Sequence, residues 1–552
     1  MRAVVGLLPA RSDLAAMLHQ PRRDLLAGLT VAIVALPLAL GFGISSGLGA
    51  AAGLTTAVIA GALAAFFGGS GLQVSGPTGA MTVVLVPIMH EHGASGVLTV
   101  GLMAGLILIG LAVARAGRYM EFVPAPVVEG FTLGIACVIG LQQVPAALGV
   151  PTPDGDQVLV IAGRAVASFA TDPHWVAVAI AVFVAALILL GGRLRPTIPF
   201  SLLAVLVATV VAELAGLDVM RIGALPSGLA APSLGFIDLS AIWSLAGAAL
   251  AVAALAALES LLSAAVADGM GVSHKHDPDR ELFGQGLANL VVPLFGGVPA
   301  TGAIARTAVN VRSGAGSRLA ALVHAGLLAV IVYTAAPLVG RIPLAALAGV
   351  LLATCIRMVE VGSVRAMARA TRSDALVLAL TAIATLALDL VKAVILGLVV
   401  AGALALRAVA RSARLRQMPL HPDLPGDHTD EERALLDEHI VAYRIDGPLL
   451  FAAHRFLLEL SEVAQVSVLV LRMSAVSAID ASGALVLKDV IAKLEHRGMV
   501  VLISGIQPGH HRPLDALDVI EKLRAEGRVF ATTPEAIAAA RVHLHAAGLL
   551  AS

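Results

Sequence analysis

The chain has few charged residues, few aromatic residues and almost no cysteine. Of its 552 residues, 13% are charged, 3% are aromatic and 2 are cysteines. Basic and acidic residues are equal in number, so the chain lacks the basic surplus of a nucleic-acid-binding protein. Cys137 and Cys355 lie in apolar segments, which favours small hydrophobic side chains over a disulfide or a metal pair.

The sequence also contains no Gly-Lys pair, and therefore no P-loop for nucleotide hydrolysis. Nothing in it points to an enzyme, a cofactor or a metal site. If the chain moves a solute, the transport is secondary or passive, or depends on a separate ATPase subunit.

Apolar sequence is what the chain has in abundance. It is 58% hydrophobic, with a mean hydropathy of +0.92, which is typical of a polytopic membrane protein. The apolar part divides into about fourteen candidate spans. They are 26–44, 51–67, 81–90, 97–114, 127–150, 176–190, 199–217, 242–262, 282–295, 304–311, 319–339, 344–356, 376–390 and 393–406. Segments 81–90 and 304–311 are too short to cross a bilayer, so we expect half-helices there.

Arginine predicts the orientation of these spans. Arginine-rich loops alternate with loops poorer in basic residues, such as 149–157. The positive-inside rule places the arginine-rich loops, the N-terminal segment 1–23 and the C-terminus in the cytoplasm. The sequence thus predicts a multi-pass protein of the cytoplasmic (inner) membrane with an even number of spans.

The composition changes after the transmembrane part, 24–411. Segment 412–436 is polar and is predicted to be a linker, and 437–552 is predicted to be a small α/β domain. Strands are expected at 440–445, 466–471, 499–503 and 528–531, and helices at 483–497, at 516–525 and from Pro534 onward.

Two apolar segments carry the same broken motif. Phe66-Phe-Gly-Gly69 leads to Thr78-Gly-Ala-Met81, and Phe295-Gly-Gly297 leads to Thr301-Gly-Ala-Ile304. Glycine and proline interrupt a helix and let a new one begin, with a threonine near its first turn. Such breaks at corresponding places in two halves point to the binding site of a transporter. Two facing helix N-termini, each with free N–H groups and a positive dipole end, make a site for an anion.

These residues resemble the sulfate permease (SulP) family of anion transporters, the bacterial relatives of the animal solute carrier family 26. The matching runs include Asp24-Leu-Leu-Ala-Gly28, Val74-Ser-Gly-Pro-Thr78, Glu259-Ser-Leu-Leu-Ser263, Gly284-Gln-Gly-Leu-Ala-Asn289 and residues 297–310. Asp480-Ala-Ser-Gly483 resembles a turn of the family's STAS domain. The resemblance implies about fourteen spans in two inverted repeats, split into core and gate domains, with elevator-like alternating access. It also implies a homodimer whose STAS domain binds a cytoplasmic regulator.

The same resemblance orders the candidate substrates. The run Ala35-Leu-Pro-Leu-Ala-Leu40 is more similar to bacterial bicarbonate and C4-dicarboxylate carriers than to sulfate carriers, which more often have glutamine where this chain has Leu38. Arg306 matches an arginine that some bicarbonate carriers lack, which favours a dicarboxylate. The order is therefore C4-dicarboxylate or bicarbonate, then sulfate.

The paired motif supplies most of the predicted substrate site. Thr78 and Thr301 can donate hydroxyl hydrogen bonds at the helix ends, while Gly79 and Gly302 let an anion approach backbone N–H groups. The alternative is that both threonines are ordinary N-caps. The full predicted substrate-binding set is Phe42, Thr78, Gly79, Thr301, Gly302, Ala303 and Arg306.

Two members of that set could instead be structural. Arg306 lies one turn beyond Gly302 and can add positive charge to the pocket, or it can cap carbonyls or reach the membrane surface. Phe42 lines the site by resemblance, and its alternative is plain packing.

Glu259 is the clearest single ionisable residue, because 246–267 is otherwise free of charge. Protonating a buried carboxyl, or pairing it with a sodium ion, would remove its repulsion of a nearby anion and so allow symport. Ser263, four residues later, shares its helix face. Both are predicted to couple transport to an ion; the alternative is a structural glutamate hydrogen-bonded between helices.

Ser482 is predicted to be a regulatory residue, since it matches the position that is phosphorylated in related anti-sigma antagonists. The alternative is that Asp480 or Ser482 only caps the following helix.

Taken together, these features predict a secondary active transporter of a small anion, coupled to protons or sodium. A passive anion channel and a membrane sensor that signals through the STAS domain are the alternatives. A nucleobase permease would have the same fold, but the STAS domain argues against it.

The predicted orientation can be tested with short epitope tags. A tag at Gly155 should be accessible from outside the cell, and tags at Lys275 and Gly426 only from the cytoplasm, because the positive-inside rule assigns them so. Labelling of Gly155 and Lys275 from the same side would contradict the span assignment.

Overall fold

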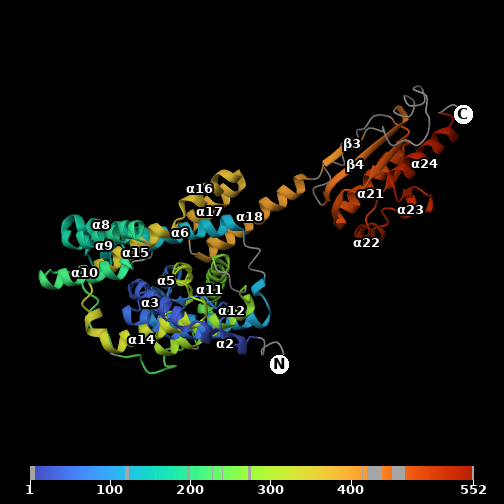
Figure 1. The fold of residues 1–552 in the computed structure, drawn as a ribbon. Coiled ribbons are helices and arrows are strands. Elements are labelled where there is room, and N and C mark those ends of the chain that lie inside the picture. The colour runs from blue at the N-terminus through green and yellow to red at the C-terminus, as the bar shows by residue number, and fades with distance from the viewer. Residues whose placement is uncertain are drawn as a thin grey trace. The chain divides into compact units, whose positions relative to one another are not determined.

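The computed structural model describes residues 7–118, 124–155, 157–195, 199–226, 228–238, 240–270, 275–388, 390–412, 414–418, 438–450 and 466–549. The chain forms two compact units, Met1–Ala401 and Gly402–Ser552 (Figure 1). The first is helical and apolar, and the second contains a β-sheet flanked by helices.

The first unit consists of helices joined by short connections. In the first half these are α2 Arg11–His19, α3 Pro21–Ser45, α4 Ala50–Phe67, α5 Gly79–Val113, α6 Ala125–Gln142, α7 Val144–Leu148, α8 Val158–Thr171, α9 Trp175–Leu194 and α10 Phe200–Leu214. Those of the second half are α11 Ile242–Met270, α12 Pro278–Val291, η2 Val292–Phe295, α13 Ile304–Arg312, α14 Leu319–Val339, α15 Leu344–Met358, α16 Val361–Ala370, α17 Arg372–Ala387 and α18 Leu390–Ser412. Two short strands, β1 Ser75–Gly76 and β2 Thr301–Gly302, complete the unit.

Every predicted span coincides with one of these helices or with two consecutive ones. The half-helix predicted at 81–90 is the first part of α5, which Gly93 interrupts with non-helical dihedral angles (φ 62°, ψ −166°). Among the described residues, 8 helices are long and apolar enough to cross a membrane. Helices α8 and α16 were not predicted, because they carry no apolar run of spanning length.

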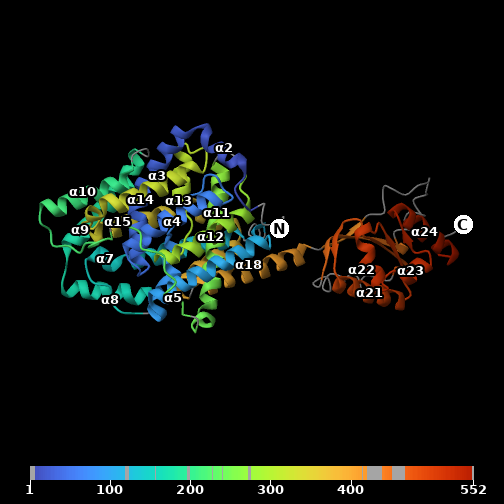
Figure 2. The same ribbon diagram turned by 90° about the horizontal axis from the view of Figure 1, so that it is seen from below.

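The helices of this unit form two groups. In one group, α3, α4, α5, α11, α12, α13 and α14 pack against one another (Figure 2). In the other, α6 packs on α17, α15 on α9, and α9 on α10. Small residues permit the close approach of helices, as they do inside membranes. A β-carbon at Gly53 of α4, for example, would lie 2.0 Å from the Ala39 carbonyl oxygen of α3.

Buried polar side chains join segments that are distant in sequence. Asp24 in α3 accepts hydrogen bonds from the Gly316 and Ser317 N–H groups, at 2.7 and 3.1 Å, just before α14. Arg318 donates to the carbonyl oxygens of Ala65, Phe66 and Gly68, where α4 ends. These groups have no partner within their own helices, so the contacts satisfy backbone atoms that would otherwise be buried without one.

The second unit is a mixed sheet with helices on both faces. Its strands are β3 Arg414–Met418, β4 Ile440–Leu449, β5 Val468–Arg472, β6 Val476–Ile479, β7 Val500–Ser504 and β8 Val529–Phe530. The order is β3-β4-β5-β7-β8, with β6 also paired to β4, and only β3 is antiparallel to its neighbour. Its helices are α21 Ala481–His496, η4 Pro508–His510, α22 His511–Ala516, α23 Glu521–Ala525 and α24 Thr533–Ala546.

Alternation along the strands explains this layering. Leu469 and Leu471 of β5 join the core under α21, whereas Val468 and Val470 join the core under α24. The helix predicted at 516–525 was wrong: α22 and α23 are separate, because Asp518 has a left-handed φ of 51° between them. Part of the predicted linker, Arg414–Met418, is instead the edge strand β3; residues 419–436, including Gly426, lie outside the described residues.

The division into units predicts that the first one folds without the second. A chain that ends at Ser412, where α18 ends, should insert into the membrane and remain monodisperse in mild detergent, with reduced but measurable transport. Gel filtration beside the full chain checks this. A shortened chain that aggregates while the full chain does not would show that the two units fold as one.

Candidate functional site

The two broken motifs meet in space. Strand β1 pairs with β2 in antiparallel fashion, with Ser75 opposite Gly302 and Gly76 opposite Thr301. Each strand leads directly into a helix, β1 into α5 and β2 into α13. Two helix N-termini from distant parts of the chain therefore lie next to each other, and each contributes roughly half a positive charge.

At the α5 end, Thr78 is the N-cap. Its hydroxyl accepts a 3.5 Å hydrogen bond from the Met81 N–H group and donates a 2.8 Å hydrogen bond to Glu259. Gly79 follows, and a β-carbon there would lie 2.1 Å from Ile139 Cδ1 and 3.1 Å from Phe42 Cε1. The predicted residues Phe42, Thr78 and Gly79 therefore lie together, with glycine required by the packing.

At the α13 end, the N-cap is Ala303, which has no side chain that could accept a hydrogen bond. Thr301 lies in β2, three residues before the helix begins at Ile304, so it stands near the first turn but is not the N-cap. Ile304 is 39% exposed, and the side chain of the N-cap residue makes no hydrogen bond to this first turn.

Gly302 was expected to let an anion approach its backbone N–H group, but protein atoms surround it. Its N–H group donates a 2.9 Å hydrogen bond to Ser260 Oγ, so it is not free for an anion. A β-carbon on Gly302 would lie 2.0 Å from Gln73 Nε2. The glycine thus makes room for the buried Gln73 amide.

Arg306 lies between the two helix ends and is 2% exposed. Its Nη2 donates to the carbonyl oxygen of Pro77, just before α5, whereas Nη1 has no hydrogen-bond partner among the described residues. One nitrogen therefore performs the carbonyl-capping role, and the other is left with a free donor.

Glu259 is the acidic member of this cluster. Its carboxyl accepts a 2.8 Å hydrogen bond from Thr78 at the start of α5, and Arg306 in the first turn of α13 is close enough to attract it. The Thr301 hydroxyl donates a 3.2 Å hydrogen bond to the Gly302 carbonyl oxygen. Ser263, by contrast, makes its 2.9 Å hydrogen bond with Thr307 of α13. The structure thus places Glu259 at both helix ends and Ser263 one turn farther along α11.

A polar stripe on α12 was not predicted from the sequence. Glu281 accepts hydrogen bonds at 2.9–3.0 Å from the N–H groups of Gly69 and Ser70 and from the amides of Gln73 and Gln285. The Gln285 amide also donates to Ser75 Oγ in β1, at 2.6 Å. One buried carboxylate therefore holds the start of the approach to β1, at Gly69, Ser70 and Gln73.

Asn289, the next member of the stripe, holds the approach to β2. Its side chain donates to the Ala300 carbonyl oxygen and accepts from the Ala300 N–H group, each at 2.8 Å. Glu281, Gln285 and Asn289 are spaced four residues apart, so a polar face within an apolar region was visible in the sequence.

In the second unit, Asp480 is the N-cap of α21, and its carboxylate accepts a 2.6 Å hydrogen bond from the Gly483 N–H group. The capping role expected of Asp480 or Ser482 therefore falls to Asp480. Ser482 is exposed in the first turn of this helix.

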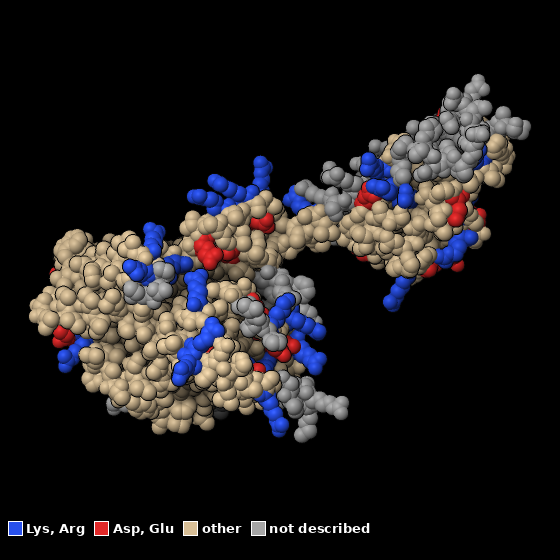
Figure 3. All heavy atoms as spheres, viewed as in Figure 1, with Lys and Arg blue, Asp and Glu red and all other residues tan. Residues whose placement is uncertain are grey.

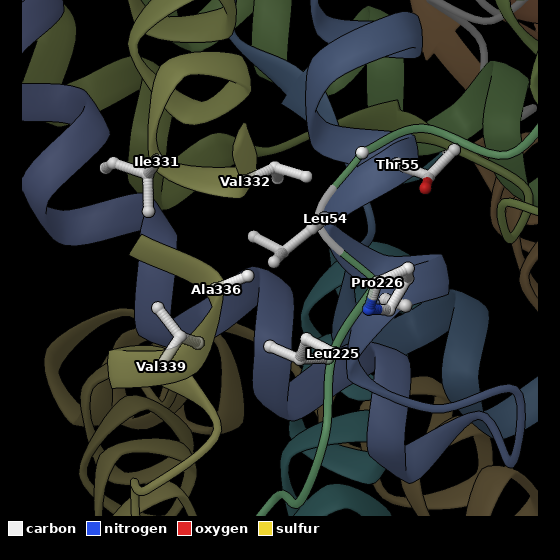
Figure 4. Close-up of a pocket in the computed structure, with 10 residues that line it drawn as sticks. Leu54, Thr55, Leu225, Pro226, Ile331, Val332, Ala336 and Val339 are labelled. Carbon is white, nitrogen blue, oxygen red and sulfur yellow. The ribbon is translucent and has the colours of Figure 1, made fainter. Parts of the chain in front are cut away.

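An apolar pocket lies elsewhere in the first unit. Its walls come from α4, α14 and the connection before α11, as Figure 4 shows for Leu54, Thr55, Leu225, Pro226, Ile331, Val332, Ala336 and Val339. No charged residue and no predicted site residue is among its lining residues.

Known proteins match both units. The model of the sulfate permease family matches residues 22–381, and that of the STAS domain matches residues 434–536. A putative sulfate transporter of Bacillus subtilis, YvdB, is 35% identical over 499 residues, which cover 89% of this chain and 92% of the relative. The bicarbonate transporter BicA of a Picosynechococcus species is 30% identical over 528 residues, which cover 91% of this chain and 92% of the relative.

Solved structures agree with these matches. The transmembrane domain of a cyanobacterial BicA is 30% identical, with a TM-score of 0.62, and the match covers 70% of this chain and 98% of that one. The anion transporter SLC26A9 of mouse, at 17% identity and a TM-score of 0.84, covers 98% of this chain and 94% of that one, and so shows the fold. The predicted fold, an apolar helical domain of this kind followed by a STAS domain, is confirmed.

The packing around Gly302 predicts a specific sensitivity. Gly302→Ala should lower stability by about 1–3 kcal/mol, because the new methyl group overlaps the buried Gln73 amide. Gly110→Ala is the matched control: no heavy atom lies within 4 Å of its β-carbon position, so stability should be unchanged or raised by about 0.5–1 kcal/mol. Thermal unfolding in detergent measures both, and equal unfolding temperatures for the two variants would contradict the assignment.

Proposed function

Because the chain belongs to the sulfate permease family and is an anion transporter, we propose that it is a secondary active transporter. In this proposal it carries a small anion across the cytoplasmic membrane by elevator-like alternating access. The observation that carries the proposal is the 2.8 Å hydrogen bond from Thr78, the N-cap of α5, to Glu259. It puts an ionisable carboxyl directly at the paired helix ends, where the charge of the carboxyl decides whether an anion is attracted or repelled.

The anion would bind between the N-termini of α5 and α13. Donors available to it are the uncapped first-turn N–H groups after Ala303 and the unpartnered Nη1 of Arg306. Phe42 and Gly79 would form the apolar wall, and Thr78 and Thr301 would offer hydroxyl groups. Gly302 supports this site through packing, because Ser260 already occupies its N–H group.

For the substrate we propose a C4-dicarboxylate or bicarbonate, then sulfate. YvdB is named for sulfate and BicA for bicarbonate, so the relatives favour neither of these two anions. Leu38, where sulfate carriers more often have glutamine, is 6% exposed in α3 and removes one polar contact from this side of the site. The guanidinium of Arg306 suits a carboxylate, to which its unpartnered Nη1 can donate a charge-assisted hydrogen bond.

Glu259 is the proposed coupling residue. A proton or a sodium ion on its carboxyl would cancel the negative charge beside the anion, so that the ion and the anion bind together. Ser263 would act through Thr307, whose hydroxyl also accepts a 3.0 Å hydrogen bond from the Val74 N–H group before β1. Ion binding on α11 would then be linked, through Ser263 and Thr307, to the paired strands β1 and β2.

The remaining assignments concern assembly. We propose a homodimer with both termini in the cytoplasm, and a STAS domain that binds a cytoplasmic regulator. The exposed Ser482 hydroxyl at the start of α21 is a position where a phosphate would be stabilised by the helix N-terminus.

A passive channel or a STAS-linked sensor remains the alternative. Neither requires an ionisable carboxyl at the binding site, and neither concentrates its anion. Uptake of labelled bicarbonate, succinate and sulfate into proteoliposomes under imposed proton or sodium gradients separates these functions, because only a coupled transporter accumulates the anion.

Substitution of Glu259 tests the coupling. Glu259→Gln resembles the protonated carboxyl, so anion binding should survive, while gradient-driven accumulation should fall to the level of simple exchange. Binding by isothermal titration and accumulation in proteoliposomes are measured on the same preparation. Glu213→Gln, which removes a carboxylate ion-paired with Arg221 near the end of α10, should leave accumulation intact. Full accumulation by Glu259→Gln would make Glu259 structural and place the coupling elsewhere.

A further inference from the structure

Helix α16, Val361–Ala370, is too short to cross a membrane by itself. It has 10 residues and connects α15 to α17, which are consecutive apolar helices of the second helix group. A connection between consecutive spans must lie at one surface of the bilayer. Figure 1 shows α16 beside α17 at one end of the unit.

The side chains of α16 divide into two faces. Ser363, Val364 and Met367 are half-buried, and Ser363 donates a 2.7 Å hydrogen bond to Glu129 of α6, which attaches the helix to the unit. No residue of α16 is buried, and Val361 is 62% exposed. The helix therefore keeps an outward face that the rest of this unit does not cover.

That outward face combines arginine with apolar side chains. Arg357, Arg365, Arg369 and Arg372 are all exposed, and none makes an ion pair or hydrogen bond with another described residue. Blue side chains gather over this region in Figure 3, where Figure 1 labels α16 and α17. Between residues 357 and 374 only Glu360 and Asp374 are acidic.

Exposed apolar residues flank the arginines on both neighbouring helices. Ile356 at the end of α15 is 59% exposed, and Leu376 at the start of α17 is 53% exposed. Such residues are unfavourable in water but fit the boundary between acyl chains and headgroups, with arginines reaching toward phosphate. Guanidinium groups bind phosphate through two hydrogen bonds at once, and the cytoplasmic leaflet is anionic.

We propose that α16, with Arg357 and Arg372 at its ends, is an interfacial helix that binds the phosphate headgroups of anionic phospholipids. The occupant is lipid and not a soluble phosphate, because the apolar residues beside the arginines need acyl chains to cover them. The choice of leaflet rests on the proposed orientation, in which the arginine-rich side is cytoplasmic. Headgroup binding would hold this end of the second helix group at the membrane surface.

Thermal unfolding of the full chain in detergent micelles tests the proposal, with phosphatidylglycerol or phosphatidylcholine added at equal concentration. We expect phosphatidylglycerol to raise the unfolding temperature more than phosphatidylcholine does. In Arg365→Gln/Arg369→Gln the apparent affinity for phosphatidylglycerol should fall roughly twenty-five-fold, since each arginine near a membrane surface contributes about a fivefold effect. Lys493→Gln/Arg512→Gln, which removes two exposed charges from the second unit, should keep the parent affinity.

Glycerol phosphate, which has the headgroup chemistry without acyl chains, should give no shift at the same concentration. Equal lipid affinity in the arginine variant and the parent would overturn the proposal. So would a full shift with glycerol phosphate, which would indicate a soluble phosphate site. A parent without any preference for phosphatidylglycerol would overturn it too and favour a protein partner for the arginines.

A depth measurement keeps the test independent of those variants. A fluorophore attached at Val361→Cys, in a chain with Cys137→Ser and Cys355→Ala, should be quenched by doxyl-labelled lipid in vesicles that contain phosphatidylglycerol. Quenching by aqueous iodide instead would show that this face of α16 lies in water, and would contradict the interfacial position.

Discussion

The antiparallel pairing of Ser75–Gly76 with Thr301–Gly302 is the interaction on which the rest of the membrane unit depends. Irregular backbone inside a membrane must find its hydrogen-bond partners within the protein, because the surrounding lipid supplies none. The two broken segments supply part of these partners to each other by pairing as β1 and β2. Having done so, they leave two helix N-termini side by side, and the electrostatic field of those ends makes the interior suitable for an anion.

That pairing would be incomplete without α12. Glu281 and Asn289 satisfy backbone groups of both segments, at Gly69 and Ser70 on one side and at Ala300 on the other. Gln285 adds a hydrogen bond to the Ser75 hydroxyl group. A buried carboxylate is costly unless every oxygen is hydrogen-bonded, and Glu281 receives four such bonds. All four of these bonds hold backbone or amide groups in place. Glu259, with its Thr78 hydroxyl partner and partial exposure, is instead the carboxyl that we propose exchanges its ion.

Much of this arrangement could be predicted from the sequence, because glycine, proline and apolar length have direct local consequences. The half-helices followed from Gly297, Pro299 and their counterparts, and the spans followed from hydropathy. Hydrogen-bond partners that are distant in sequence, from 42 to 210 residues apart, could not be predicted. Nothing local shows that Ser260 takes the Gly302 N–H group, that Ser263 turns to Thr307, or that Gln285 meets Ser75. Helix α16 was not predicted because its arginines interrupt every apolar run. That pattern nevertheless suits a helix at a membrane surface.

The Thr78 hydroxyl explains how an anion and an ion could depend on each other. A hydroxyl has a single proton to donate. Thr78 donates it to Glu259 while its oxygen accepts from the Met81 N–H group. An anion that needs the Thr78 proton must therefore compete with the ionised carboxyl of Glu259. A proton or cation on that carboxyl weakens the hydrogen bond that it accepts from Thr78. The Thr78 hydroxyl can then donate its proton to the anion. In the proposed cycle the helix cap and the coupling residue thus share one hydrogen bond, and this sharing links the two binding events.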